Sequence, residues 1–235
     1  MALFEDPSLP CGHLPKTVRL FPLPNLVLFP HVIQPLRVFE ERYRDLFETA
    51  LDADGLIAMA ALAPGWEQDY DGRPPLLSTA CLGRITTHHR LDDGTYNVLL
   101  LGLSRVRLVE ELPPRRSFRE ASVEVLDDVY PPAPAAALPA LTRRLRDTLA
   151  RILPHSPQAD EQWDQLFSGE VSVGGLTDVI SYMLDIDLEK KQALLAEVNV
   201  CRRAELLLSH LEDAANDLTP GRSGRCGFPP EFGLN

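Results

Sequence analysis

The polar residues that could support chemistry in this sequence stand at spacings that do not favour it. His88 and His89 carry metal-binding imidazoles, but adjacent residues of a strand point to opposite faces and cannot bind one ion. Asp92 and Asp93 precede Gly94 in a pattern typical of a tight turn, rather than of a general acid and its base. These residues therefore predict a β-hairpin and no metal site.

Phosphate chemistry is not indicated either. The sequence contains no Gly-x-x-x-x-Gly-Lys-Ser/Thr motif, the loop that cradles nucleotide phosphates. Its lysines are Lys16, Lys190 and Lys191, and the last two fall on the charged face of a predicted helix. A catalytic lysine has to be desolvated, whereas such a face keeps it in water. We therefore expect neither ATP hydrolysis nor proteolysis: no enzyme, no catalytic residue and no cofactor.

The charge of the chain argues against nucleic acids as partners. Its 235 residues include 34 acidic and 23 basic side chains, which gives a net charge of −11. This charge opposes the attraction to phosphates that supplies most non-specific affinity for DNA and RNA. The hydrophobic content of 45% predicts a globular protein with a real core.

Features of targeting and redox chemistry are also missing. The sequence begins without a basic region and apolar signal segment, and nowhere do about 18 apolar residues run together as a membrane span requires. We therefore expect a cytoplasmic protein that has no membrane partner. The cysteines form no Cys-x-x-Cys pair, which predicts free thiols. They are Cys11, Cys81, Cys201 and Cys226.

A binding surface needs less than catalysis does, and the sequence offers one candidate. Trp66 and Tyr70 lie in the polar loop 64–75, with Arg73 beside them, and Tyr96 stands at the predicted hairpin. Aromatic side chains and arginine are enriched at recognition hot spots. These four residues are our predicted peptide-binding residues. The alternative is that the aromatic rings merely cover one end of the scaffold.

Hydrophobic periodicity predicts the elements that position this loop. Strands are expected at residues 17–21, 26–29, 36–39, 56–62, 80–91, 95–103, 105–112 and 119–126. Residues 40–51 place Tyr43, Leu46 and Phe47 on one face of a helix. Residues 95–103 are apolar on both faces, as a central strand would be. Residues 16–129 therefore predict a β-barrel with one packed helix.

Helices follow a proline- and alanine-rich hinge that begins at residue 130. They are expected at residues 138–152, 156–167, 176–184, 188–198 and 200–211. Ser156 before Pro157 predicts the start of the second, with Trp163 facing inward, and Gly174 and Gly175 predict a break before the third. The fold class is thus α+β: a barrel (16–129) followed by a helical bundle (130–217). Residues 1–15 are expected to form a flexible arm and 218–235 a disordered tail.

Three stretches of the barrel region and one of the helical region resemble a known family. The first stretch is Phe-Pro-Leu-Pro-Asn-Leu-Val-Leu-Phe-Pro at 21–30, followed by Gln-Pro-Leu-Arg-Val-Phe-Glu-Glu-Arg-Tyr at 34–43. The second is Leu-Gly-Arg-Ile at 82–85 with its continuation through 91–108, and the third is residues 118–127. The stretch in the helical region is residues 187–208. Together they resemble the N-terminal domain of Lon protease, the substrate-binding module of that ATP-dependent enzyme. His31 departs from the pattern, because the family usually has glycine there. Glycine would allow φ > 0, which histidine tolerates less well.

The resemblance implies a PUA-like barrel, a helical bundle, and recognition of unfolded or degron-bearing polypeptides. Since we find no ATPase or Ser-Lys protease motif, we expect a stand-alone, non-catalytic polypeptide-binding module. It would act as an adaptor or sequestering factor in protein quality control, alone or with a separate ATPase or protease. An apolar groove between barrel and bundle would support this hypothesis, and a filled, featureless junction would weaken it.

The alternative is an RNA- or small-molecule-binding protein, because PUA-like barrels include RNA-binding members and a fold alone does not fix function. Arginines come closest to a basic patch at positions 105, 107, 115, 116 and 119. The net charge of the chain opposes this alternative unless those arginines cluster.

Overall fold

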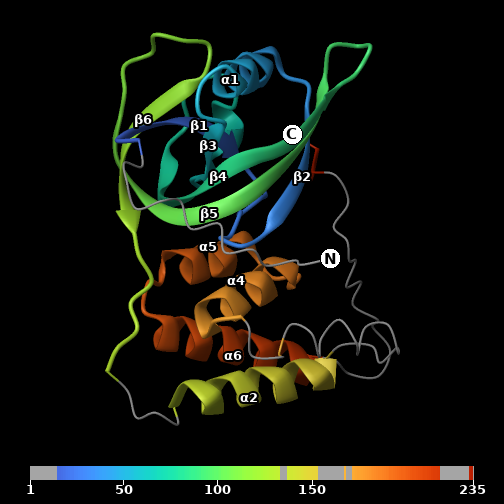
Figure 1. Ribbon diagram of the computed structural model, residues 1–235, viewed down its shortest axis with the longest axis vertical. Coiled ribbons are helices and arrows are strands. Elements are labelled where there is room, and N and C mark those ends of the chain that lie inside the picture. The colour runs from blue at the N-terminus through green and yellow to red at the C-terminus, as the bar shows by residue number, and fades with distance from the viewer. Residues whose placement is uncertain (1–14, 133–136, 153–166, 168–170, 218–232, 235) are drawn as a thin grey trace.

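The computed structural model describes residues 15–132, 137–152, 167, 171–217 and 233–234. Its strands are β1 (Thr17–Leu23), β2 (Ile33–Val38), β3 (Leu56–Leu62), β4 (Leu76–Arg90), β5 (Tyr96–Glu111), β6 (Arg119–Leu126) and β7 (Gly233–Leu234). They form one mixed sheet in the order β4-β3-β1-β6-β5-β2-β7, and a further pairing of β4 with β5 closes the barrel seen in Figure 1. Together with the helices below, this confirms the predicted α+β class.

The strand on which the barrel closes is β5. Residues 96–101 of β5 pair with β2 and residues 105–111 pair with β6, while residues 96–107 pair with residues 79–90 of β4. Val98, Leu100 and Val106 on this strand are at most 2% exposed. A segment that is apolar on both faces is therefore the central strand, as predicted.

The expectation of a strand at residues 26–29 is wrong. This segment pairs with no strand in the described part of the chain, yet Val27, Leu28 and Phe29 are buried. It passes against β5 at Gly102, where a Cβ atom would lie 2.0 Å from the backbone oxygen of Phe29. The apolar run between two prolines thus corresponds to a buried segment without regular secondary structure. Proline cannot donate a hydrogen bond to a neighbouring strand, but it does not prevent the apolar side chains from packing.

The next turn places a histidine in an unusual backbone conformation. His31 has φ 65°, the left-handed region that glycine would enter without strain. The N–H of His31 donates to the oxygen of Gly102 at 2.9 Å, and the N–H of Gly102 donates to the oxygen of Val32 at 2.8 Å. These two hydrogen bonds hold the turn against β5.

The helix α1 (Glu41–Leu51) lies over the end of the barrel that faces away from the bundle (Figure 1). Its apolar face is buried, as the periodicity predicted. Phe21 of β1 contacts Tyr43 and Phe47 edge-on, with ring centroids 4.6 and 5.5 Å apart. The Tyr43 hydroxyl donates to the backbone oxygen of Pro22 at 2.9 Å. These contacts fix the start of α1 against the barrel rim.

The described helices of the bundle are α2 (Ala137–Ile152), α4 (Val173–Met183), α5 (Leu188–Ala196) and α6 (Val200–Asp217). The break expected at Gly174 and Gly175 is wrong, because both residues lie in the first turn of α4. Ser172 caps this helix by accepting a hydrogen bond from the N–H of Gly175 at 3.1 Å. A Cβ on Gly174 would lie 2.3 Å from Asp128 Oδ2, so glycine is there to permit close packing.

Several expectations concern residues outside the described part of the chain. These are the arm before residue 15, the helix at 156–166 with Trp163, and residues 218–232 of the expected tail. At the far end, Gly233 and Leu234 pair in parallel with Leu36 and Arg37 of β2. We propose that the chain divides into the barrel at 16–129 and the bundle at 130–217, because β6 ends at Leu126 and α2 begins at Ala137.

The barrel and the bundle meet through buried charges. Arg105 of β5 forms an ion pair with Asp178 of α4, and its Nε donates to the backbone oxygen of Leu195 at 2.9 Å. Arg203 of α6 donates to both carboxylate oxygens of Asp128, at 2.9 and 2.6 Å. Arg105, Asp178 and Arg203 are all buried. The junction is therefore filled, although it is far from featureless.

Candidate functional site

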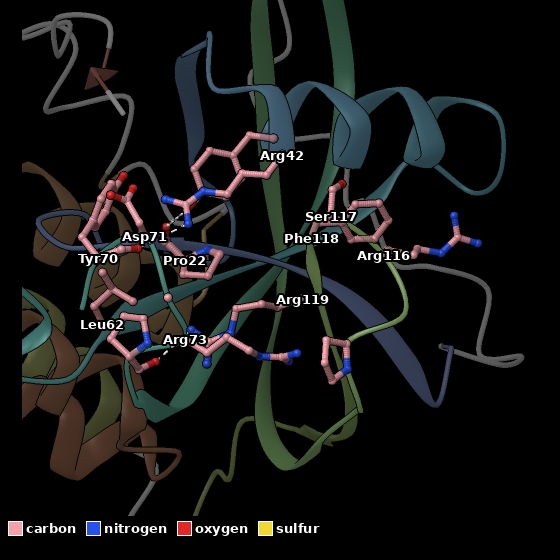
Figure 2. Close-up of a pocket in the computed structure, with 14 residues that line it drawn as sticks. Pro22, Arg42, Leu62, Tyr70, Asp71, Arg73, Arg116, Ser117, Phe118 and Arg119 are labelled. Atoms are coloured by element: carbon pink, nitrogen blue, oxygen red, sulfur yellow. Dashed lines mark hydrogen bonds between the residues drawn. The ribbon is translucent and has the colours of Figure 1, made fainter.

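A pocket of about 230 Å³ opens at the barrel rim, on the side of α1. It lies between the start of α1, the loop that follows β3, and the loop that precedes β6 (Figure 2). The apolar part of its lining includes Pro22, Tyr43, Leu62 and Phe118. The pocket therefore has an apolar part in its lining, and none of its lining residues comes from the described helices of the bundle.

One wall of the pocket is aromatic and is held by a carboxylate. The Tyr70 hydroxyl donates to Glu40 Oε1 at 2.8 Å, and the Nε of Arg42 donates to Glu40 Oε2 at 2.9 Å. The Arg42 guanidinium also lies 4.9 Å from the Tyr70 ring centroid and 4.8 Å from that of Tyr43. Burial and the hydrogen bond to Glu40 raise the pKa of Tyr70. Its ring is thus fixed in a neutral, hydrogen-bonded state.

Trp66 supports this wall from outside. It begins the short 3₁₀-helix η1 (Trp66–Gln68), which Gly65 precedes with φ 89°. The Trp66 and Tyr70 rings meet edge-on with centroids 5.6 Å apart. Such aromatic pairs contribute about 0.5–1.5 kcal/mol beyond the area they bury. The loop is therefore ordered around its own aromatic residues.

Two arginines on the opposite side share one glutamate. Arg119 of β6 donates from Nε and Nη2 to Glu111 at 2.8 and 2.5 Å, and Arg73 donates from Nε to the same carboxylate at 3.0 Å. Arg119 also donates to the backbone oxygen of Pro74 at 2.8 Å. Burial opposes ionisation of Glu111, but the two arginines outweigh it and lower its pKa. This cluster ties the loop after β3 to the barrel wall.

The third wall is the loop before β6. The Ser117 hydroxyl donates to the carboxylate of Asp45 on α1, which attaches this loop to the helix. Phe118 is 4% exposed and Arg116 lies over its ring, with the guanidinium carbon 5.6 Å from the ring centroid. All three walls are therefore held in place by side-chain contacts before any ligand arrives.

The predicted binding residues are partly brought together. Tyr70 and Arg73 line the pocket and Trp66 contacts Tyr70, whereas Tyr96 is not part of the lining. The Tyr96 ring is 6% exposed, and its hydroxyl donates to Glu48 Oε1 at 2.7 Å. Other lining residues come from segments distant from the loop. Arg42 and Phe118 were not predicted as binding residues, whereas Arg116 and Arg119 were considered only for the alternative basic patch.

Metal ligands and a reactive thiol are two features that could indicate catalysis. Within the described ranges, no group of three or more His, Cys, Asp or Glu side chains could hold a metal ion. Burial raises the pKa of the Cys81 thiol, which makes it a poor nucleophile. No helix in the described part of the chain is long and apolar enough to span a membrane, and the cytoplasmic location stays a prediction.

Solved structures share this fold. The N-terminal domain of Lon protease from the Mycobacterium avium complex aligns with a TM-score of 0.63 and 19% identity, covering 87% of this chain and 100% of that one. The N-terminal domain of Lon from Xanthomonas campestris gives a TM-score of 0.56 and 22% identity, covering 82% and 97%. The architecture of barrel and bundle is thus that of a Lon N-terminal domain.

The sequence places the chain in the same family. It belongs to the family of the ATP-dependent protease La (LON) substrate-binding domain, whose model matches residues 17–213. Lon protease 2 of Myxococcus xanthus is 26% identical over 198 residues, which cover 84% of this chain and 24% of that protein. Lon protease of Heliobacterium modesticaldum is 28% identical over 195 residues, covering 82% and 23%. The chain thus spans about a quarter of the length of these relatives.

Proposed function

We propose that this chain recognises polypeptides without chemistry, and that the pocket holds an apolar side chain of an extended or unfolded segment. The observation that carries the proposal is the preformed pocket, which Leu62, Tyr70 and Phe118 line, in a member of a substrate-binding domain family. Side chains fixed in advance lose little conformational entropy on binding, which favours affinity.

The size of the pocket supports a side chain rather than a small molecule as its occupant. Sites for drug-sized ligands and cofactors usually enclose about 300–1,000 Å³. The volume here is about 230 Å³ and the pocket is open to solvent. One large apolar residue of a longer chain fits this description better than a free cofactor does.

Two of the five arginines considered for an RNA-binding patch, Arg105 and Arg107, lie outside the pocket and are paired with carboxylates. Arg105 is buried against Asp178, and Arg107 pairs on the barrel wall with Glu124 at 2.9 Å. Together with the net charge of −11, this separation favours polypeptide over RNA. We further propose that the chain acts as an adaptor or sequestering factor, alone or with a separate ATPase or protease. This role requires only that the chain binds polypeptides and does not act on them.

Isothermal titration calorimetry with unfolded proteins and apolar peptides tests the proposal. Tyr70→Ala removes the wall and should weaken binding about tenfold or more, as expected for an aromatic hot spot. Val109→Ala is the matched control, because Val109 is apolar, 63% exposed and outside the pocket. An absence of binding at high micromolar concentration would refute the function. Equal losses in both variants would refute the site.

A further inference from the structure

The rim of the pocket is basic in a chain that is strongly acidic overall. Arg42, Arg73, Arg116 and Arg119 all contribute to the lining, and Asp71 is the acidic residue that joins them among the described residues. Three of the arginines are held by hydrogen bonds to carboxylates behind the lining, namely Glu40 and Glu111. The fourth, Arg116, has no such hydrogen bond to a carboxylate among the described residues.

Arg116 keeps its hydrogen-bonding capacity free. Its nearest carboxylate is that of Glu120, 3.9 Å from Nε, which is an ion-pair distance but too long for a hydrogen bond. Half of the side chain is exposed, and no acceptor in the described part of the chain bonds to its guanidinium. Arginine presents five N–H donors in a planar fork that matches a carboxylate.

The guanidinium of Arg116 lies next to an apolar residue of the pocket lining. Arg116 lies over the ring of Phe118, while Ser117 between them is bound to Asp45 of α1. Figure 2 shows the Arg116 side chain running outward from the pocket, past Phe118, towards solvent. The guanidinium of Arg116 thus lies at the outer edge of the pocket lining, beside Phe118.

We propose that the pocket prefers an apolar residue that has a carboxylate beside it, and that Arg116 recognises this carboxylate. The proposal rests on the polypeptide-binding function above and specifies its substrate class. The carboxylate can be an Asp or Glu side chain next to the apolar residue or the C-terminal group of the ligand chain. Both would meet the same free guanidinium fork.

The net charge of the chain makes this proposal easy to distinguish from a general electrostatic effect. At −11, the protein as a whole repels acidic peptides, so replacing Glu by Gln in a ligand should strengthen binding if long-range charge dominates. If Arg116 reads the carboxylate, the same replacement should weaken binding. The two effects have opposite signs.

The experiment measures fluorescence anisotropy of labelled peptides with one apolar residue flanked by Glu or by Gln, each with a free or amidated C-terminus. We expect the Glu peptide to bind about two- to fivefold more tightly than the Gln peptide, as for a partly exposed ion pair. Arg116→Gln should abolish the difference. Arg107→Gln, which alters an exposed arginine outside the pocket, should preserve it.

The possible outcomes distinguish failure of the carboxylate preference from failure of the proposed polypeptide binding. If only the free C-terminus matters, the carboxylate read by Arg116 is the terminal one. If Glu, Gln, free and amidated peptides bind equally, or if the difference survives in Arg116→Gln, the carboxylate preference is refuted and polypeptide binding stands. If none of the peptides binds wild-type protein at high micromolar concentration, the proposed function itself is refuted.

Discussion

Arg105 of β5 and Asp178 of α4 form an ion pair across the junction of barrel and bundle in which neither side chain is more than 2% exposed. Arg105 Nη1 lies 3.1 Å from Asp178 Oδ2, and Arg203 Nε lies 3.5 Å from Asp178 Oδ1. Asp128, whose side chain is 23% exposed, completes the group, so that two arginines and two carboxylates neutralise one another. Breaking such a group costs much more than forming it contributes.

Asp178→Asn should therefore destabilise the fold severely. The amide cannot neutralise Arg105 and Arg203, and loss of one partner of a buried pair costs about 3–5 kcal/mol. Urea denaturation followed by circular dichroism measures the free energy of unfolding. Glu124→Gln is the control, because Glu124 and its partner Arg107 are 58% and 55% exposed and should lose at most about 1 kcal/mol. Equal losses would contradict the role assigned to the buried pair.

Acid should loosen the cluster around Glu111. Because the folded state lowers the pKa of Glu111, its contribution to stability is present above the unfolded pKa of about 4.3 and is lost as pH falls through the lowered folded value. Glu111→Gln should cost about 1–2 kcal/mol at pH 7, and this difference from wild type should shrink towards pH 3. Glu110→Gln, at the exposed neighbouring residue, is the control. A constant difference across the range would contradict the assignment.

Replacing His31 by glycine should stabilise the protein. The left-handed conformation destabilises the folded state by about 1–2 kcal/mol when the residue has a Cβ, and glycine removes this strain. Glycine also makes the unfolded chain more flexible, which offsets about 0.4–1 kcal/mol of the gain. We expect a net gain of up to about 1.5 kcal/mol in thermal or urea unfolding. His31→Val should lose stability, because a branched Cβ makes φ 65° harder to adopt. The opposite order would mean that the His31 side chain contributes contacts that outweigh backbone strain.

Gly102→Ala should be among the most damaging small changes in the barrel. The new methyl would meet the backbone oxygen of Phe29, which cannot move without shifting the buried segment 27–29. We expect a loss of about 3 kcal/mol from overpacking. Gly55→Ala is an informative comparison, since its Cβ would meet nothing within 4 Å and only its φ of 68° resists the change. It should lose about 1 kcal/mol.

Much of the fold could be predicted because its signals are local. The hairpin at Asp92–Gly94, the α1 helix and the central strand all follow from turn residues and from period-2 or period-3.6 spacing. Residues 26–29 were misassigned because burial, rather than strand pairing, is what an apolar run reports. Gly174 was misassigned because a glycine required for close packing looks the same in a sequence as one that ends a helix.

The site was less predictable because its parts meet only in three dimensions. The loop aromatic residues Trp66 and Tyr70 could be singled out, since they stand in a polar segment. Phe118 could not, and Arg119 was singled out only for a possible basic patch, because both residues follow that loop by more than forty positions. The burial of Arg105 could not be predicted for the same reason. Arginine is ordinarily exposed, and Arg105 is buried because it pairs with Asp178, which is 73 positions away in the sequence.

The edge-on contact between Trp66 and Tyr70 also gives the pocket an optical reporter. The sequence contains two tryptophans, Trp66 and Trp163, so a Trp163→Phe variant would emit from the indole beside the proposed site alone. A ligand that enters beside Tyr70 changes the surroundings of that indole, and the emission wavelength and quenching by iodide should change with it. Occupancy could then be followed on unlabelled protein and unlabelled ligand, at a position 5.6 Å from the ring that forms the wall.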